Sequence, residues 1–192
     1  MFRIRSARRI GLWAAALLAT AAVAPAVASA QSTRTYGATT LTLNAATAAA
    51  LTSLGVTPGV VAPATANSDG SLSFPITDPL PVALGTGVIT HAGGISLSAG
   101  STTVDLTDFN INLRRASLSA IVGGSRVRIL RLDFSGARPG VSHGQLTLGP
   151  VTASLTRKAA GALNSAFGVT AFTKGLVLGT ATVSYRLVPQ AW

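Results

Sequence analysis

The chain has 192 residues, a formal net charge of +10 and no cysteine. Without cysteine, disulfides and thiolate chemistry are excluded, so the fold has to rest on an apolar core, which 48% hydrophobic residues can supply. The length suits one ordinary domain.

Residues 1–30 have the pattern of an export signal. Four arginines precede an apolar run from Ile10 to Val23, and Ala28-Ser29-Ala30 offers a small-x-small cleavage site. The run is too short and alanine-rich for a membrane span, and Arg8-Arg9 leaves Sec and twin-arginine export both open. Cleavage near Ala30 leaves one domain, 31–192, with no transmembrane span. We expect it to be secreted or associated with the cell envelope.

The remaining chain alternates apolar and polar residues between glycine-rich turns, a pattern typical of antiparallel strands with one buried face. We therefore predict an all-β fold, an antiparallel β-sandwich with two short α-helices. The expected strands are 39–43, 60–65, 71–76, 86–91, 95–99, 102–113, 117–122, 126–135, 145–148, 151–155 and 176–187.

Two of these strands, 102–113 and 126–135, change the parity of their apolar positions in mid-strand. A slip of one residue would turn the apolar set toward solvent, so each strand needs a β-bulge to restore its facing. We place the bulges near Thr107-Asp108 and near Ile129-Leu130.

Two segments break the strand pattern and resemble each other: LNAATAAALTSLGVT (43–57) and LTRKAAGALNSAFGVT (155–170). Each begins with a residue that can cap a helix, Asn44 or Thr156, and each closes on a glycine that can take the left-handed conformation. We predict a short helix in each segment, the two closing the ends of the sandwich.

Patterns for catalysis or metal binding are missing from the sequence. There is no nucleophile elbow, and the close pair Asp105 and Asp108 is expected at the surface beside a bulge. His91 and His143 lie far apart and lack metal-ligand spacing. We therefore predict that the protein is not an enzyme and holds no metal or cofactor.

Arginine offers one candidate binding face. With the second bulge in place, the side chains of Arg126, Arg128 and Arg131 point to the same side of the sheet. Guanidinium groups bind phosphate and carboxylate through two parallel hydrogen bonds. On an exported protein such a face would meet anionic cell-wall polymers or lipid headgroups, although an ordinary solvated face is the alternative. Aromatic residues make up 5% of the chain, too few for us to expect a nucleic-acid partner. The resulting prediction is a non-catalytic binding or structural domain. A further alternative is a pocket for an apolar ligand between the two sheets, which the abundant alanine, valine and leucine permit but do not indicate.

Several pieces between Phe74 and Val183 carry a family resemblance: SFPI, GTGVITHAGGISL, VDLTDFNI, SLSAIV, LRLDFSG and ASLTRKAAGALNSAFG…FTKG. Their order resembles, distantly, the HtaA-type domain of secreted and surface haem-binding proteins of actinobacteria. The resemblance implies an antiparallel β-sandwich with short helices. It also implies an alternative function, haem binding or transport.

The haem ligands of that family are not retained in this sequence. Such domains begin with a Trp-Gly motif followed by a ligating tyrosine, whereas Tyr36 here has no tryptophan beside it. The family's histidine precedes a Leu-Asp-Leu strand, and the matching turn, Ala99-Gly100-Ser101, has none. Under the haem alternative the ligand would be Tyr36 or His91. Otherwise we expect His91 to be an ordinary strand histidine.

Overall fold

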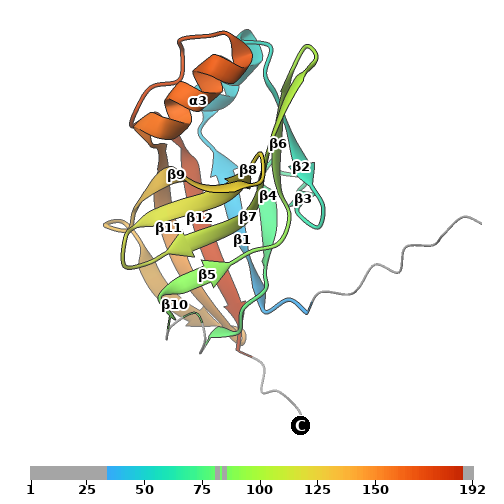
Figure 1. Cartoon of the computed structure of the whole chain (residues 1–192). Coiled ribbons are helices and arrows are strands. Elements are labelled where there is room, and N and C mark those ends of the chain that lie inside the picture. Colours follow the sequence, from blue (N-terminus) through green and yellow to red (C-terminus); the bar gives the residue numbers. More distant parts are fainter. Residues whose placement is uncertain (1–33, 81–82, 84–85, 188–192) are drawn as a thin grey trace, which may run out of the picture. The chain divides into compact units, whose positions relative to one another are not determined.

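The computed structural model describes residues 34–80, 83 and 86–187 (Figure 1). The expected export signal at 1–30 and its cleavage site lie outside these residues and stay predictions. Within the described part, no helix combines the length and the apolar character needed to cross a membrane.

The described residues form one antiparallel sheet of twelve strands. The strands are β1 (Gly37–Leu43), β2 (Thr57–Val61), β3 (Thr65–Ala66), β4 (Leu72–Ile76), β5 (Val88–Thr90), β6 (Gly94–Ala99), β7 (Thr102–Asn112), β8 (Ser117–Val122), β9 (Ser125–Asp133), β10 (Arg138–Ser142), β11 (Gln145–Leu155) and β12 (Val177–Arg186). They pair in the order β2-β6-β7-β8-β9-β11-β12-β1-β4-β3, with β10 added to β11 and β5 added to β7. The all-β class is thereby confirmed.

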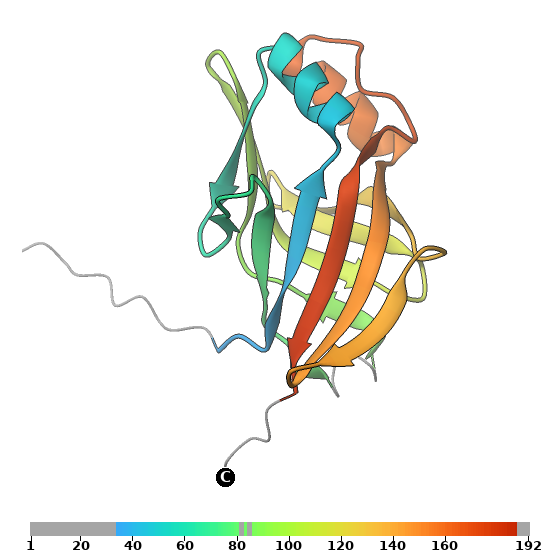
Figure 2. The same cartoon turned by 180° about the vertical axis from the view of Figure 1, so that it is seen from behind.

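This sheet curls until it nearly closes on itself (Figures 1 and 2). Strand β5 pairs with β7, and the chain just beyond β5 reaches the end of β4 through a bridge between Ile76 and His91. Beside the bridge, the N–H of Thr77 donates to the carbonyl of Thr90 over 3.0 Å. We expected a sandwich of two separate sheets that face each other. The structure instead has one continuous, barrel-like sheet, and two sides of this sheet face each other. Twist and bulges give long strands the curvature that such closure needs.

The predicted bulge on β7 is present. Thr107 pairs with Ile121 and Asn110 with Ser119, so two residues of β7 stand opposite one residue of β8. Asp108 takes a φ of 51°, a left-handed conformation that aspartate tolerates better than most residues. The bulge lets Leu106 and Phe109 both face the interior, although their positions have opposite parity.

The predicted bulge on β9 is also present. Leu118 of β8 pairs with Leu130 and Ser119 with Arg128, which leaves Ile129 as the extra residue. Ile129 and Leu130 are both buried, whereas Arg128 on one side is exposed.

Both predicted helices are confirmed. Helix α1 (Ala45–Ser53) is capped by Asn44, whose Oδ1 accepts from the N–H of Ala46 over 2.9 Å. Helix α3 (Arg157–Phe167) is capped by Thr156, whose Oγ1 accepts from the N–H of Ala159 over 3.2 Å.

The expected position of the helices at both ends of the sandwich is wrong, because both lie at the same end of the sheet (Figures 1 and 2). The pairing explains this. Helix α1 follows β1 and α3 follows β11, and both strands run antiparallel to β12. The last residues of β1 and β11 therefore meet the same end of β12, where Leu43 pairs with Gly179 and Ser154 with Val177.

Strand β10 was not expected from the sequence. All of its residues are exposed, so RPGVS shows no alternation of apolar and polar side chains. The expected strand 60–65 is divided between β2 and β3, and the two expected strands 145–148 and 151–155 are one strand, β11.

Candidate ligand-binding site

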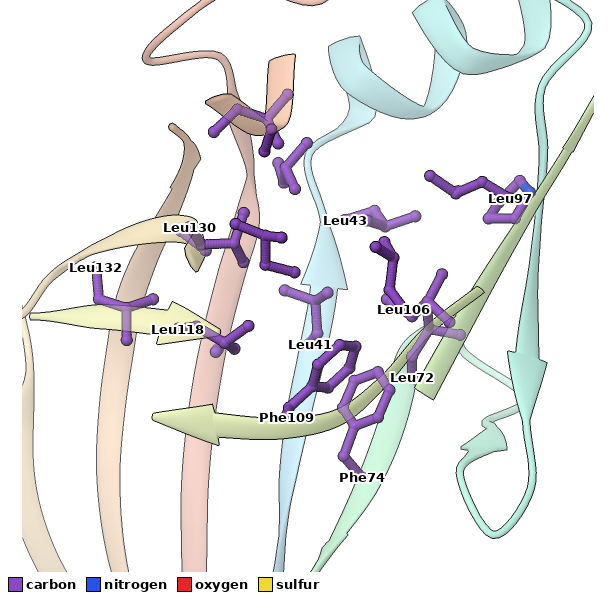
Figure 3. Close-up of a pocket in the computed structure, with 18 of the residues that line it drawn as sticks. Leu41, Leu43, Leu72, Phe74, Leu97, Leu106, Phe109, Leu118, Leu130 and Leu132 are labelled. Carbon is purple, nitrogen blue, oxygen red and sulfur yellow. The ribbon is translucent and has the colours of Figure 1, made fainter. Parts of the chain in front are cut away.

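The inner face of the curved sheet and the two helices enclose a cavity of about 340 Å³. Figure 3 shows leucine and phenylalanine side chains from β1, β4, β6, β7, β8 and β9 converging on it. The volume lies within the range of roughly 300–1,000 Å³ that is usual for small-molecule sites.

The cavity wall is apolar apart from four side chains. The described residues that contribute aliphatic or aromatic surface are Leu41, Leu43, Leu51, Pro58, Leu72, Phe74, Ile95, Leu97, Val104, Leu106, Phe109, Ile111, Leu118, Val122, Val127, Ile129, Leu130, Leu132, Phe134, Val151, Ala153, Leu155, Ala159, Ala162, Leu163, Ala166, Phe172, Leu178, Ala181 and Val183. The polar ones are Thr39, Thr47, His91 and Lys158.

Small side chains on α3 help to keep the cavity open. Ala159, Ala162 and Ala166 recur at helical spacing on the face that α3 turns toward the cavity. Their methyl groups leave the space that leucines at the same positions would occupy. The curvature of the sheet adds to this, since its two sides are held apart by strand pairing and cannot collapse onto each other.

The cavity reaches solvent beside α3. Among the lining residues, Lys158, Ala162 and Ala166 of α3 and Pro58 of β2 are exposed, and several others, including Val122 and Val127 at the β8–β9 hairpin, are partly exposed. At the other end of the cavity the lining residues are buried, and the rings of Phe74 and Phe109 meet edge to face, 5.0 Å between centroids. We call the solvent side beside α3 the mouth.

His91 is held by two hydrogen bonds and is 4% exposed. Its Nδ1 lies 3.0 Å from the carbonyl oxygen of Phe109, which can only accept, so Nδ1 carries the proton. Nε2 then accepts from the hydroxyl of Thr39 over 2.7 Å. Burial lowers the pKa of His91 to about 4, which keeps the ring neutral at pH 7. A ligand bond to iron would require one of the two hydrogen bonds to break.

Neither tyrosine of the chain lines the cavity. Tyr36 is half-buried just before β1, at the end of the sheet away from the helices, where its N–H donates to the carbonyl of Ile76 over 2.9 Å. Tyr185 is 3% exposed and its hydroxyl has no hydrogen-bond partner. Burial, with a contribution from the charge of Asp78, raises the pKa of Tyr185 to about 12.

The three candidate arginines lie on the outer side of β9, away from the cavity. Arg126, Arg128 and Arg131 are all exposed, as the bulge requires. The Nη1 of Arg126 donates to the carbonyl oxygen of Asp108 over 2.8 Å, so part of its guanidinium is engaged at the β7 bulge. Binding of an anionic polymer at this face stays a prediction.

The acidic residues and the second histidine form no site with the cavity. Asp105 and Asp108 are exposed on the outer side of β7, and His143 is exposed in the turn between β10 and β11. Within the described ranges, no group of three or more His, Cys, Asp or Glu side chains is arranged to hold a metal ion.

The fold of this sheet with its two helices is similar to that of HtaA-type domains. The C-terminal domain of HtaA from Corynebacterium glutamicum has a TM-score of 0.56 to this chain at 16% identity, with 79% of this chain and 97% of that chain covered. The haem-binding protein HtaB from the same organism gives a TM-score of 0.50 at 10% identity, with 79% and 93% covered. No model of a protein family matches the sequence, and comparison with curated proteins gives no match. The distant resemblance seen in the sequence is thereby confirmed as a shared fold.

Proposed function

We propose that this protein is a non-catalytic domain that binds one apolar small molecule in the cavity between its sheet and helices. The cavity itself carries the proposal, because its volume suits a small molecule, its wall is almost entirely apolar and it is partly open to solvent. Burying apolar ligand surface there is favourable by roughly 25 cal/mol per Å² before the costs of association.

The polar side chains of the lining support a binding role rather than chemistry. Thr47 donates its hydroxyl to the carbonyl of Val177 over 2.6 Å, and Thr39 and His91 bond to each other. The Thr39–His91 contact has the geometry of a hydroxyl and its base, but both side chains are buried at the closed end of the cavity, away from the mouth. HtaB, which shares the fold, is a haem-binding protein. With the expected export signal, the binding would take place outside the cytoplasm or at the cell envelope.

The proposal predicts that blocking the mouth abolishes binding. Ala162 faces the cavity from the exposed side of α3, so Ala162→Trp places an indole in the mouth. Ser165→Trp, on the same helix but outside the lining, is the matched control. Titration with the neutral fluorescent probe N-phenyl-1-naphthylamine should show saturable binding to the wild type and the control, and at least about tenfold weaker binding to Ala162→Trp. Equal binding by all three proteins, or none by the wild type, would refute the proposal.

Haem is the second candidate ligand, because the fold is shared with HtaB. The described residues do not suit it well: the lining holds no tyrosine, and both nitrogens of the His91 ring are engaged. Haemin titrated into the mature protein should therefore give only a broad, non-stoichiometric change in the Soret region. A sharp stoichiometric band that disappears in His91→Ala or Tyr36→Ala would replace the first proposal with haem binding.

A further inference from the structure

Lys158 is the one charged side chain among the described residues that line the cavity. It is exposed and lies at the mouth, as expected when lysine methylenes lie against apolar surface while the ammonium stays in water. In the described part of the chain its ammonium makes neither a hydrogen bond nor an ion pair. The other polar lining groups, on Thr39, Thr47 and His91, all have protein partners.

The surroundings of Lys158 leave its positive charge uncompensated. Lys158 and Arg157 are the first two residues of α3, and the first turn of this helix has no acidic residue. Cations are disfavoured at this end of a helix, because the helix macrodipole is positive there. Two cations at its N-terminus therefore destabilise α3. Residues that lower the stability of their own element are often found at functional sites.

The cavity extends along the strands over several residues. The inward residues of β1 that line it run from Thr39 to Leu43, a length of about 13 Å at the usual rise of a strand. Buried apolar side chains and the Thr39–His91 pair close one end, and Lys158 stands at the other. An apolar chamber of this depth with an uncompensated cation at its mouth is complementary to an apolar chain with an anionic head.

We propose that the ligand is a single-chain anionic amphiphile, with its apolar tail inside the sheet and its carboxylate or phosphate head paired with Lys158. This inference rests on the proposed function and narrows it to one ligand class. The cavity would supply the affinity for the tail, and Lys158 would supply the preference for an anionic head.

The test compares ligands of equal chain length and different head charge: palmitate, hexadecanol and hexadecyltrimethylammonium, each below its micelle concentration. Displacement of N-phenyl-1-naphthylamine from the mature chain measures their affinities. We expect palmitate to bind about fivefold more tightly than hexadecanol, as for an exposed ion pair, and hexadecyltrimethylammonium to bind least tightly. The preference for palmitate should shrink as salt is added.

The chain offers a closely matched pair of variants, because Lys158 and Lys174 are its two lysines and both are exposed. Lys158→Gln should remove the preference for palmitate over hexadecanol, while Lys174→Gln, outside the cavity, should keep it. Hexadecyl phosphate in the same assay separates a phosphate head from a carboxylate head by its affinity relative to palmitate.

The outcomes separate this inference from the proposed function. If hexadecanol and palmitate bind the wild type equally, or if the preference survives Lys158→Gln, the inference is wrong while the apolar site stands. If none of the compounds displaces the probe, the proposed function fails as well.

Discussion

His91 shows how the surroundings of one residue decide its role. It is one of two histidines in the sequence, and the sequence is compatible both with a haem ligand and with an ordinary strand residue at this position. In the structure, Phe109 and Thr39 occupy its two nitrogens, and burial disfavours its charged form. Thr39 lies 52 residues away in the chain, so the sequence around His91 carries no sign of this partner.

The low pKa of His91 predicts a loss of stability in mild acid. Its folded pKa is about 4 against an ordinary value of 6.5, so between these values the unfolded chain binds a proton that the folded chain does not. The free energy of unfolding should therefore fall by about 2 kcal/mol between about pH 7 and about pH 4.5 because of this group. Urea unfolding at the two pH values measures it.

The second histidine supplies the control. His91→Gln should be less stable at pH 7 and should lose most of this pH dependence, whereas His143→Gln, at an exposed turn, should keep it. Asp69 and Asp133 also have lowered pKa values, caused mainly by hydrogen bonds from Ser71 and Ser135. Their effect on the free energy of unfolding falls at lower pH than the range used for His91. An unchanged pH dependence in His91→Gln would show that His91 is not the group responsible.

Strands, bulges and helices that have a local signal in the sequence can be predicted from it, whereas an element without such a signal cannot. The two bulges were located because a change of apolar parity has to be corrected within the strand. The helices were located by their caps at Asn44 and Thr156. Strand β10 was missed because all five of its residues are exposed, which removes the alternation on which a prediction depends.

Thr156 is predicted to stabilise α3 and to tie it to the sheet. Its hydroxyl oxygen accepts from the N–H of Ala159, and its O–H donates to the carbonyl oxygen of Arg128 over 3.1 Å. Thr156→Ala loses both contacts and should lower the free energy of unfolding by about 1 kcal/mol. Thr170→Ala, at an exposed position after the helix, should change it by less than about 0.5 kcal/mol. Chemical denaturation compares the two, and equal effects would contradict the capping role.

For the folded unit as a whole, the important feature is that sheet and helices share one interior. Leu51 of α1 and Leu163 of α3 line the same cavity as Leu41 and Phe109 of the sheet. The bridge between Ile76 and His91 joins the two sides of the sheet at the end away from the helices. Among the described residues, the buried apolar side chains of the sheet and of both helices form one cluster, and none forms a separate core.

A shared interior predicts one cooperative unfolding transition. Far-ultraviolet circular dichroism reports strands and helices, and near-ultraviolet dichroism reports buried Tyr185 at the strand end away from the helices. The two signals should give the same denaturation midpoint. A helix signal that is lost first, while the tyrosine signal persists, would show that the helical end unfolds separately. Palmitate, if bound as proposed, should raise both midpoints together.

The sequence by itself determined the β class, most strand positions, both bulges and both helices, because side-chain period, parity and capping act within a few residues. It also gave the expectation of export. Only the tertiary structure decided that the sheet closes on itself, that both helices cover one end, and that His91 is buried against Thr39. These features depend on pairing between strands far apart in the chain, such as β1 with β12 and β4 with the residues after β5. The cavity and the position of Lys158 at its mouth follow from that pairing, since no local pattern fixes which inward faces meet.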